Sequence, residues 1–318
     1  MPPLNANPAF SRRLFCPVAA LVLALGLAAP AARAQAQAPA ANSEAAREAE
    51  LHAALDAGYK AGTRGPATVK LLDEATLALP PNEIFIPTAE GTRILRALGN
   101  TINNGTSYQG IVLGTTPSDG WIVVVRYIKE GYIKDDDAKS WNADELLQNL
   151  KDGNEEANKD RAARGFPQVE IIGWIEKPTY DAVTHRLVWS LSSKHKGEPA
   201  GANTGVNYNT YALGRDGYFS LNLLTNSSSI GADKAVAHEL LAALDYNSGR
   251  RYEDFNASTD HIATYGIIAL VGGIAAKKLG LLALIGAFVL KFAKVIFLGV
   301  AAFLGGVYKL FGRKKTQT

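Results

Sequence analysis

The C-terminal end of the chain constrains its structure most. Residues 264–318 contain eight basic residues and no acidic residue, and only lysines separate the apolar runs 264–276, 279–290 and 295–308. A helix needs about 20 mostly apolar residues to cross a bilayer. Lysines near the end of such a helix can extend their amines to the membrane surface. The sequence therefore predicts a helical membrane anchor over residues 261–318.

The interrupted apolar runs leave two arrangements of this anchor open. One crossing somewhere within 279–308 would leave the basic residues 313–315 on the cytoplasmic side, which positively charged ends favour. On one unbroken helix, four basic side chains would instead form a single stripe, typical of a helix lying in the membrane surface. These four are Lys277, Lys291, Lys309 and Arg313. Both arrangements make the lipid bilayer a partner of the chain.

The N-terminal end predicts export from the cytoplasm. Residues 1–34 carry three arginines and no acid, and the apolar run 14–29 is followed by a small-x-small site at 32–34. This pattern is typical of a signal peptide cleaved before Gln35. An uncleaved anchor is the alternative, and the paired arginines also resemble a twin-arginine signal. Cys16 lies within the signal, so the mature chain would contain no cysteine.

The distribution of charge indicates where the protein works. All 30 acidic residues lie between the two basic ends. A basic start, an acidic middle and a basic, apolar end are typical of a membrane-targeted chain and not of a nucleic-acid-binding protein. We therefore expect a protein of the bacterial cytoplasmic (inner) membrane whose main domain faces the periplasm or the exterior. Other envelope proteins are the expected partners, and the sequence indicates no particular oligomeric state.

The middle of the chain predicts one α+β domain over residues 66–260, after a flexible lead and a short helix over 35–65. Composition excludes a disordered chain, since 47% of the residues are hydrophobic and 20% are charged. Turn residues between β-prone runs predict hairpins, and hence a mostly antiparallel sheet with about three helices. The expected hairpins pair 108–114 with 121–128 and 211–213 with 219–223. Further strands are expected at 169–175, which ends before Pro178, and at 187–192, which is expected to be half-buried. Helices are expected at 88–98, 142–164 and 231–244.

Motifs for catalysis or metal binding are missing from the sequence. His238-Glu239 lacks the second histidine that a zinc protease needs, because position 242 is alanine, so it is expected on a solvated helix face. No phosphate-binding glycine loop and no nucleophile elbow is present. We therefore predict no catalytic residue, no cofactor and no metal site.

One stretch stands out as a surface for a partner. Aromatic and acidic residues interleave around residues 131–140, although a plain solvated turn explains them equally well. The acidic run lacks the spacing of a calcium loop. The residues expected to contact a partner are Tyr132, Asp135, Asp136, Asp137 and Trp141.

Four ordered segments carry a resemblance to a known family: GTRILRALGN at 91–100, the run GYIKDDDAKSW…RAARGF at 131–166, GWIEKPTYDAVTHRLVWS at 173–190 and GRRYEDFNASTDHIATYGIIALVGGIAAK at 249–277. In this order they resemble the bacterial, uncharacterised, membrane-anchored proteins grouped as domain of unknown function 2167. The resemblance covers about 66–310 and departs mildly at His261, where the family pattern often has lysine. It implies a signal peptide, an exported domain and a C-terminal anchor, and it brings no activity, cofactor or catalytic residue.

These observations together favour a non-catalytic envelope protein whose acidic domain binds a partner or stabilises an assembly at the membrane. Two alternatives remain open. One is an envelope hydrolase with an unrecognised site, and the other is a protein that senses or modifies the bilayer through its C-terminal tail.

Overall fold

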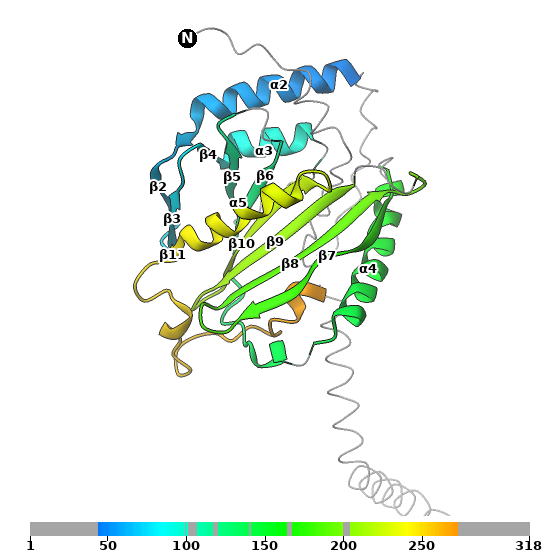
Figure 1. The fold of residues 1–318 in the computed structure, drawn as a ribbon. Coiled ribbons are helices and arrows are strands. Elements are labelled where there is room, and N and C mark those ends of the chain that lie inside the picture. The colour runs from blue at the N-terminus through cyan, green and yellow to red at the C-terminus, as the bar shows by residue number, and fades with distance from the viewer. Residues whose placement is uncertain are drawn as a thin grey trace, which may run out of the picture. The chain divides into compact units, whose positions relative to one another are not determined.

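A computed structural model describes residues 44–98, 100, 107–116, 120–139, 141–163, 167–199 and 204–272 (Figure 1). The chain divides into two units, residues 1–273 and 274–318, and the described residues all belong to the first. The expected signal peptide at 1–34 and residues 273–318 of the expected anchor lie outside the described part. Within that part, no helix combines the length and apolarity required to span a bilayer.

An eight-stranded antiparallel sheet forms the centre of the domain, and a three-stranded antiparallel sheet lies beside it. The strands of the large sheet, in spatial order, are β1 (Thr63–Arg64), β4 (Glu83–Pro87), β5 (Tyr108–Gly114), β6 (Ile122–Ile128), β10 (Tyr218–Asn226), β9 (Gly205–Leu213), β8 (Arg186–His195) and β7 (Val169–Asp181). Those of the small sheet are β11 (Leu244–Tyr246), β3 (Ala75–Leu79) and β2 (Ala67–Leu71).

Helix α5 (Ile230–Ala243) and the small sheet cover one face of the large sheet, which we call the front face (Figure 1). The helix buries Ala237, Leu240 and Leu241, whose spacing of three and four residues places them on one side. They pack with alternate residues of β6, β9 and β10, because side chains of a strand point alternately to its two faces.

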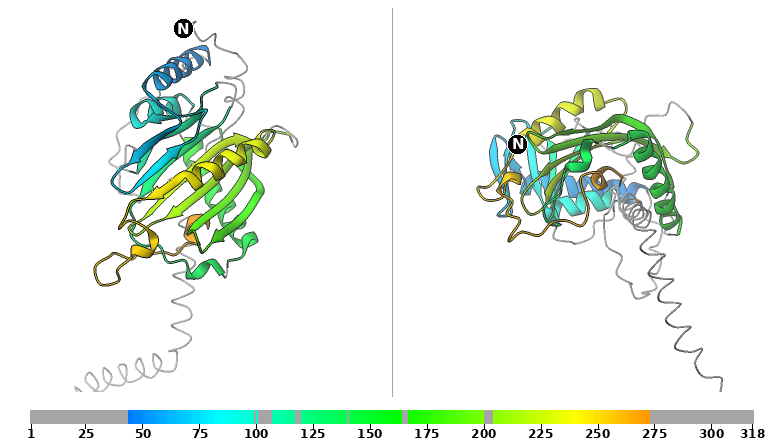
Figure 2. Two further views of the ribbon diagram at one scale, coloured as in Figure 1. Left: turned by 60° about the vertical axis from the view of Figure 1, so that its left-hand side comes forward. Right: turned by 90° about the horizontal axis from the view of Figure 1, so that it is seen from below.

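Three helices cover the opposite face, which we call the back face (Figure 2). Helices α2 (Glu44–Ala61) and α3 (Thr88–Ala97) pack over β4, β5 and β6, where they form one apolar cluster. Helix α4 (Ala143–Ala163) and the C-terminal residues 252–271 pack over β7, β8, β9 and β10 and form a second apolar cluster. Two short 3₁₀ helices, η1 (Asp136–Lys139) and η2 (Tyr252–Asp254), precede the parts of the chain that build this second cluster.

Helix α4 is fixed to strand β7 by asparagine side chains as well as by apolar packing. Its buried residues recur every four positions: Leu146, Leu150, Asn154 and Asn158. Asn158 accepts the backbone N–H of Val169 at 2.9 Å and donates to its carbonyl at 2.7 Å, and Asn154 donates to the same carbonyl at 2.7 Å. These amides pair with the backbone of an edge strand as a neighbouring strand would.

The expected α+β class and the mostly antiparallel sheet are confirmed. Both hairpins form, β5 with β6 and β9 with β10, and the three expected helices are α3, α4 and α5. The short helix expected before Gly62 is α2.

Two expectations about strands were wrong. Strand β7 continues through Pro178 to Asp181, because it lies at the edge of the sheet and its register shifts between Glu176 and Thr179, where a proline is tolerated. Strand β8 is buried on both faces along most of its length. It lies between β7 and β9 inside the sheet, so the expected half-burial does not apply.

The domain also extends further toward the C-terminus than residue 260. Ile267, Leu270 and Val271 are buried in the back-face cluster, and the backbone N–H of Ile267 donates to the carbonyl of Lys134 at 3.0 Å. The first part of the region expected to be the anchor, residues 261–272, therefore packs within the domain.

Candidate functional site

Tyr132, the first residue of the expected partner surface, holds the C-terminal segment in place. Its backbone N–H donates to the carbonyl of His261 at 2.8 Å, and its carbonyl accepts the N–H of Ala263 at 2.9 Å. Its ring stacks on those of Tyr252 and Phe255, with centroids 4.4 and 3.9 Å away. The residue is half-buried in contacts within the domain.

The other expected residues are also engaged with the domain, apart from Asp136, which is exposed. The carboxylate of Asp137 accepts the backbone N–H of Ile268, while burial raises its pKa. Trp141 is half-buried against the second apolar cluster. The structure thus brings these residues together around the segment that leads toward the tail, and their binding of a partner stays a prediction.

Asp135 belongs to a cluster of acid, phenol and imidazole groups. The hydroxyl of Tyr180 donates to Asp135 Oδ2 at 2.7 Å and lies 3.0 Å from His185 Nδ1. The His185 ring stacks on Tyr252, whose hydroxyl donates to the carbonyl of Ile133 at 2.8 Å. Burial and the neighbouring Asp135 raise the pKa of Tyr180. Each of these side-chain groups has a partner inside the domain, so the cluster serves to join β7, β8 and the C-terminal segment.

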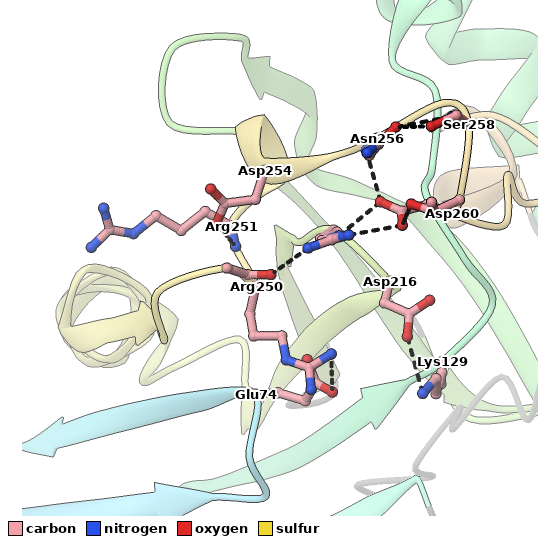
Figure 3. A network of polar contacts seen from close by, with 12 residues as sticks. Glu74, Lys129, Asp216, Arg250, Arg251, Asp254, Asn256, Ser258 and Asp260 are labelled. Atoms are coloured by element: carbon pink, nitrogen blue, oxygen red, sulfur yellow. Dashed lines mark hydrogen bonds and ion pairs between the residues drawn. The ribbon is translucent and has the colours of Figure 1, made fainter.

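An ion-pair network fixes residues 249–260 (Figure 3). Arg215 donates to both carboxylate oxygens of Asp260, at 2.7 and 2.9 Å, and to the carbonyl of Gly249 at 3.2 Å. Asp260 also accepts the N–H of Asn256 at 2.8 Å, and the guanidinium holds the pKa of Asp260 well below its usual range. Two further ion pairs lie nearby: Lys129 with Asp216 at 3.0 Å and Arg250 with Glu74 at 3.7 Å.

A second polar cluster lies at the front face. The hydroxyl of Tyr208 donates to Glu176 at 2.9 Å and lies 2.8 Å from His238 Nε2, and Lys234 pairs with the same Glu176. Burial and the neighbouring Glu176 raise the pKa of Tyr208. His238 is exposed, as expected, but its contact with Tyr208 ties α5 to β9.

The back face carries a row of polar residues that the two apolar clusters flank. Arg126 of β6 faces Tyr108 of β5 and Ser220 of β10 across the sheet. Asn222 faces Asn209, to which it donates a hydrogen bond. We call the following residues the polar strip: Tyr108, Arg126, Asn207, Asn209, Ser220 and Asn222.

The polar strip differs from the other clusters because part of its hydrogen-bonding capacity is unmet. The Tyr108 hydroxyl and the Oδ1 atoms of Asn207 and Asn222 are buried, and they have no hydrogen-bond partner among the described residues. Arg126 is half-buried, and within the same residues it makes neither an ion pair nor a hydrogen bond. Each buried, unpartnered polar group costs about 1–3 kcal/mol, so a strip of them is unfavourable unless it binds something.

Sequence reasoning missed this strip, although two signals point to it. Arg126 interrupts the apolar run Ile122–Ile128, and Asn207 and Asn209 occupy alternate positions of β9. In a sheet covered on both faces, polar residues at such core positions break the usual pattern, as functional sites commonly do.

The comparisons with known proteins identify the family. The sequence model of the family described as "Protein of unknown function (DUF2167)" matches residues 63–303. No curated protein matches the chain significantly. Among solved structures, cyanobacterial PsbP (CyanoP) from Synechocystis sp. PCC 6803 is similar at 11% identity and a TM-score of 0.34, covering 57% of this chain and 92% of that chain. The Ran-binding protein Mog1p of Saccharomyces cerevisiae is similar at 14% identity and a TM-score of 0.30, covering 56% and 94%. At these values neither similarity bears on function. Because the family model spans most of its length, the chain belongs to the DUF2167 family of proteins of unknown function.

Proposed function

We propose that this protein is a membrane-anchored protein of the bacterial envelope whose exported domain binds a ligand or partner without catalysing a reaction. The observation that carries the binding role is the polar strip. The buried Tyr108 hydroxyl and the Oδ1 atoms of Asn207 and Asn222 lack partners among the described residues, and such groups are rare in native structures unless they serve a purpose. The surface expected around residues 131–140 supports the role less, because most of its side chains already hold the C-terminal segment.

The proposed location rests on the two ends of the chain. The basic, apolar and acid-free composition of residues 1–34 supports export, and that of 264–318 supports attachment to the inner membrane. The acidic domain between them would then face the periplasm or the exterior.

A photocrosslinking experiment in bacterial cells tests both parts of the proposal. A small diazirine amino acid replaces Asn222 in the full chain, and a matched variant carries it at Val183, an exposed turn residue that is 87% accessible. We expect a discrete adduct in the membrane pellet from position 222 and none from position 183. A chain ending at residue 272 should keep the adduct and move to the soluble fraction.

Two results would count against this account. Equal labelling from positions 222 and 183 would argue against a binding site at the polar strip. Recovery of the full chain in the soluble fraction, without detergent, would argue against the anchor.

A further inference from the structure

Arg126 carries a charge that no described residue of the polar strip neutralises. It lies among Val123, Val124 and Val125 on β6 and is half-buried. Burial lowers its pKa, and the phenol of Tyr108 is its electrostatic neighbour. No carboxylate among the described residues pairs with it. A cation held away from water without a counter-charge destabilises the folded state. A bound anion would therefore stabilise Arg126.

The neighbours of Arg126 supply further hydrogen-bond donors. Tyr108 and Ser220 lie directly opposite it on the two adjacent strands, where side chains are about 4.5–5.5 Å apart at Cβ. Asn222 is two residues further along β10 on the same face, within reach of a long arginine side chain. A planar guanidinium donates two parallel hydrogen bonds to a carboxylate, and hydroxyl and amide groups can donate to its remaining lone pairs.

The charge and the flanks of the strip narrow the class of anion. Arg126 is the single charged residue of the strip, so the strip matches one negative charge better than the two of a phosphate group. Apolar side chains lie on both sides, for example Val124 and Ile111 in one cluster and Trp189 and Leu191 in the other. An apolar substituent of the ligand would therefore bury its surface beside the strip.

We infer that the ligand of the polar strip is an organic monocarboxylate with an apolar substituent, and that its carboxylate pairs with the guanidinium of Arg126. This inference rests on the proposed binding function, and it names the chemistry of the ligand at the same site.

Thermal unfolding of the full chain, purified in an uncharged detergent, tests the inference with sodium hexanoate as the probe. Hexanol, sodium phosphate and sodium chloride at equal ionic strength serve as comparisons. A ligand at ten to a hundred times its Kd should raise the Tm of the wild type by about 3–10 °C. We expect hexanoate alone to do so. In the Arg126→Met variant its Kd, measured by calorimetry, should be at least about tenfold weaker.

A second arginine provides the matched control. Arg186 is also half-buried, but it donates to the carbonyl of Leu244 at 3.2 Å. Arg186→Met should lower the Tm and keep the response to hexanoate. Without any probe, Arg126→Met should be at least as stable as the wild type, because it removes an unpaired and partly desolvated charge.

The outcomes separate this inference from the proposed function. An equal response of wild type and Arg126→Met to hexanoate, or a larger response to phosphate or hexanol, overturns the carboxylate assignment. If no probe stabilises the wild type while position 222 still crosslinks in cells, the carboxylate inference fails and the binding function stands. If position 222 does not crosslink either, both fail.

Discussion

Replacing Glu83 with glutamine is expected to stabilise the folded domain at pH 8 and to leave its stability at pH 4 almost unchanged. Glu83 begins β4, is 5% exposed, and its Oε2 is buried without a partner among the described residues. Burial, with a smaller contribution from Glu239, raises the pKa of Glu83 from 4.5 to about 8.

The direction of this effect follows from the carboxyl proton of Glu83, which the folded state binds more tightly than the unfolded state. Below pH 4.5 the carboxyl of Glu83 is protonated in both the folded and the unfolded state, so it causes no loss of stability. Between pH 4.5 and about 8 only the folded state keeps the proton, and stability falls as pH rises. At about 1.4 kcal/mol per pH unit, the loss reaches about 4–5 kcal/mol. Glutamine resembles the protonated acid and does not titrate, so the loss should be absent from the variant.

Denaturant unfolding of wild type and Glu83→Gln from pH 4 to pH 8.5 measures this difference. The matched control is Glu156→Gln, which changes an exposed residue of α4 that pairs with Lys159 at the surface and should alter the free energy of unfolding by less than about 0.5 kcal/mol. Parallel pH profiles for wild type and Glu83→Gln would show that the carboxyl of Glu83 is ionised in the folded protein.

The second large effect is expected at Asn158. Its replacement by alanine removes the acceptor of the Val169 N–H and one of the two donors to the Val169 carbonyl. Because this N–H is left buried without a partner, we expect the free energy of unfolding to fall by about 2–4 kcal/mol.

Chemical denaturation at constant pH checks this value, with Gln148→Ala as the control on the exposed side of the same helix. Among the described residues, the side chain of Gln148 bonds only to Asp152, in solvent-exposed surroundings, so its loss should cost less than about 0.5 kcal/mol. A loss at Asn158 no larger than that at Gln148 would mean that the asparagines do not hold α4 against β7.

The sequence predicts the helices and hairpins of this fold well, because the residues that specify each of them lie close together in the chain. Turn residues between 114 and 121 specify the hairpin of β5 and β6. Asp144 and Glu145 in the first turn of α4 and Arg161 in its last turn complement the helix dipole.

The features that the sequence did not predict depend on contacts between segments that are far apart in the chain. From the sequence alone, Asn154 and Asn158 are expected at the surface. They are buried because the edge strand β7 packs beside them. The strand that Pro178 was expected to end continues, because only the finished sheet places it at an edge. The polar strip arises where three strands bring Arg126 and the asparagines to one face. The residue types mark β6 and β9 as unusual, but they do not show that these strands and β10 lie side by side.

If the polar strip serves binding at the expense of stability, replacing Asn207 with an apolar residue should stabilise the domain. The side chain of Asn207 is 5% exposed with an unpartnered Oδ1 among the described residues, and Leu191 and Leu224 are its direct neighbours across the sheet. Leucine at this position would join the two apolar clusters of the back face.

The measurement is the free energy of unfolding of purified Asn207→Leu against wild type. We expect an increase of about 1–2 kcal/mol, because an amide with an unpartnered oxygen is replaced by an apolar side chain of similar volume. A decrease of more than about 1 kcal/mol would mean that the asparagine already has its partners within the fold and that the polar strip is structural.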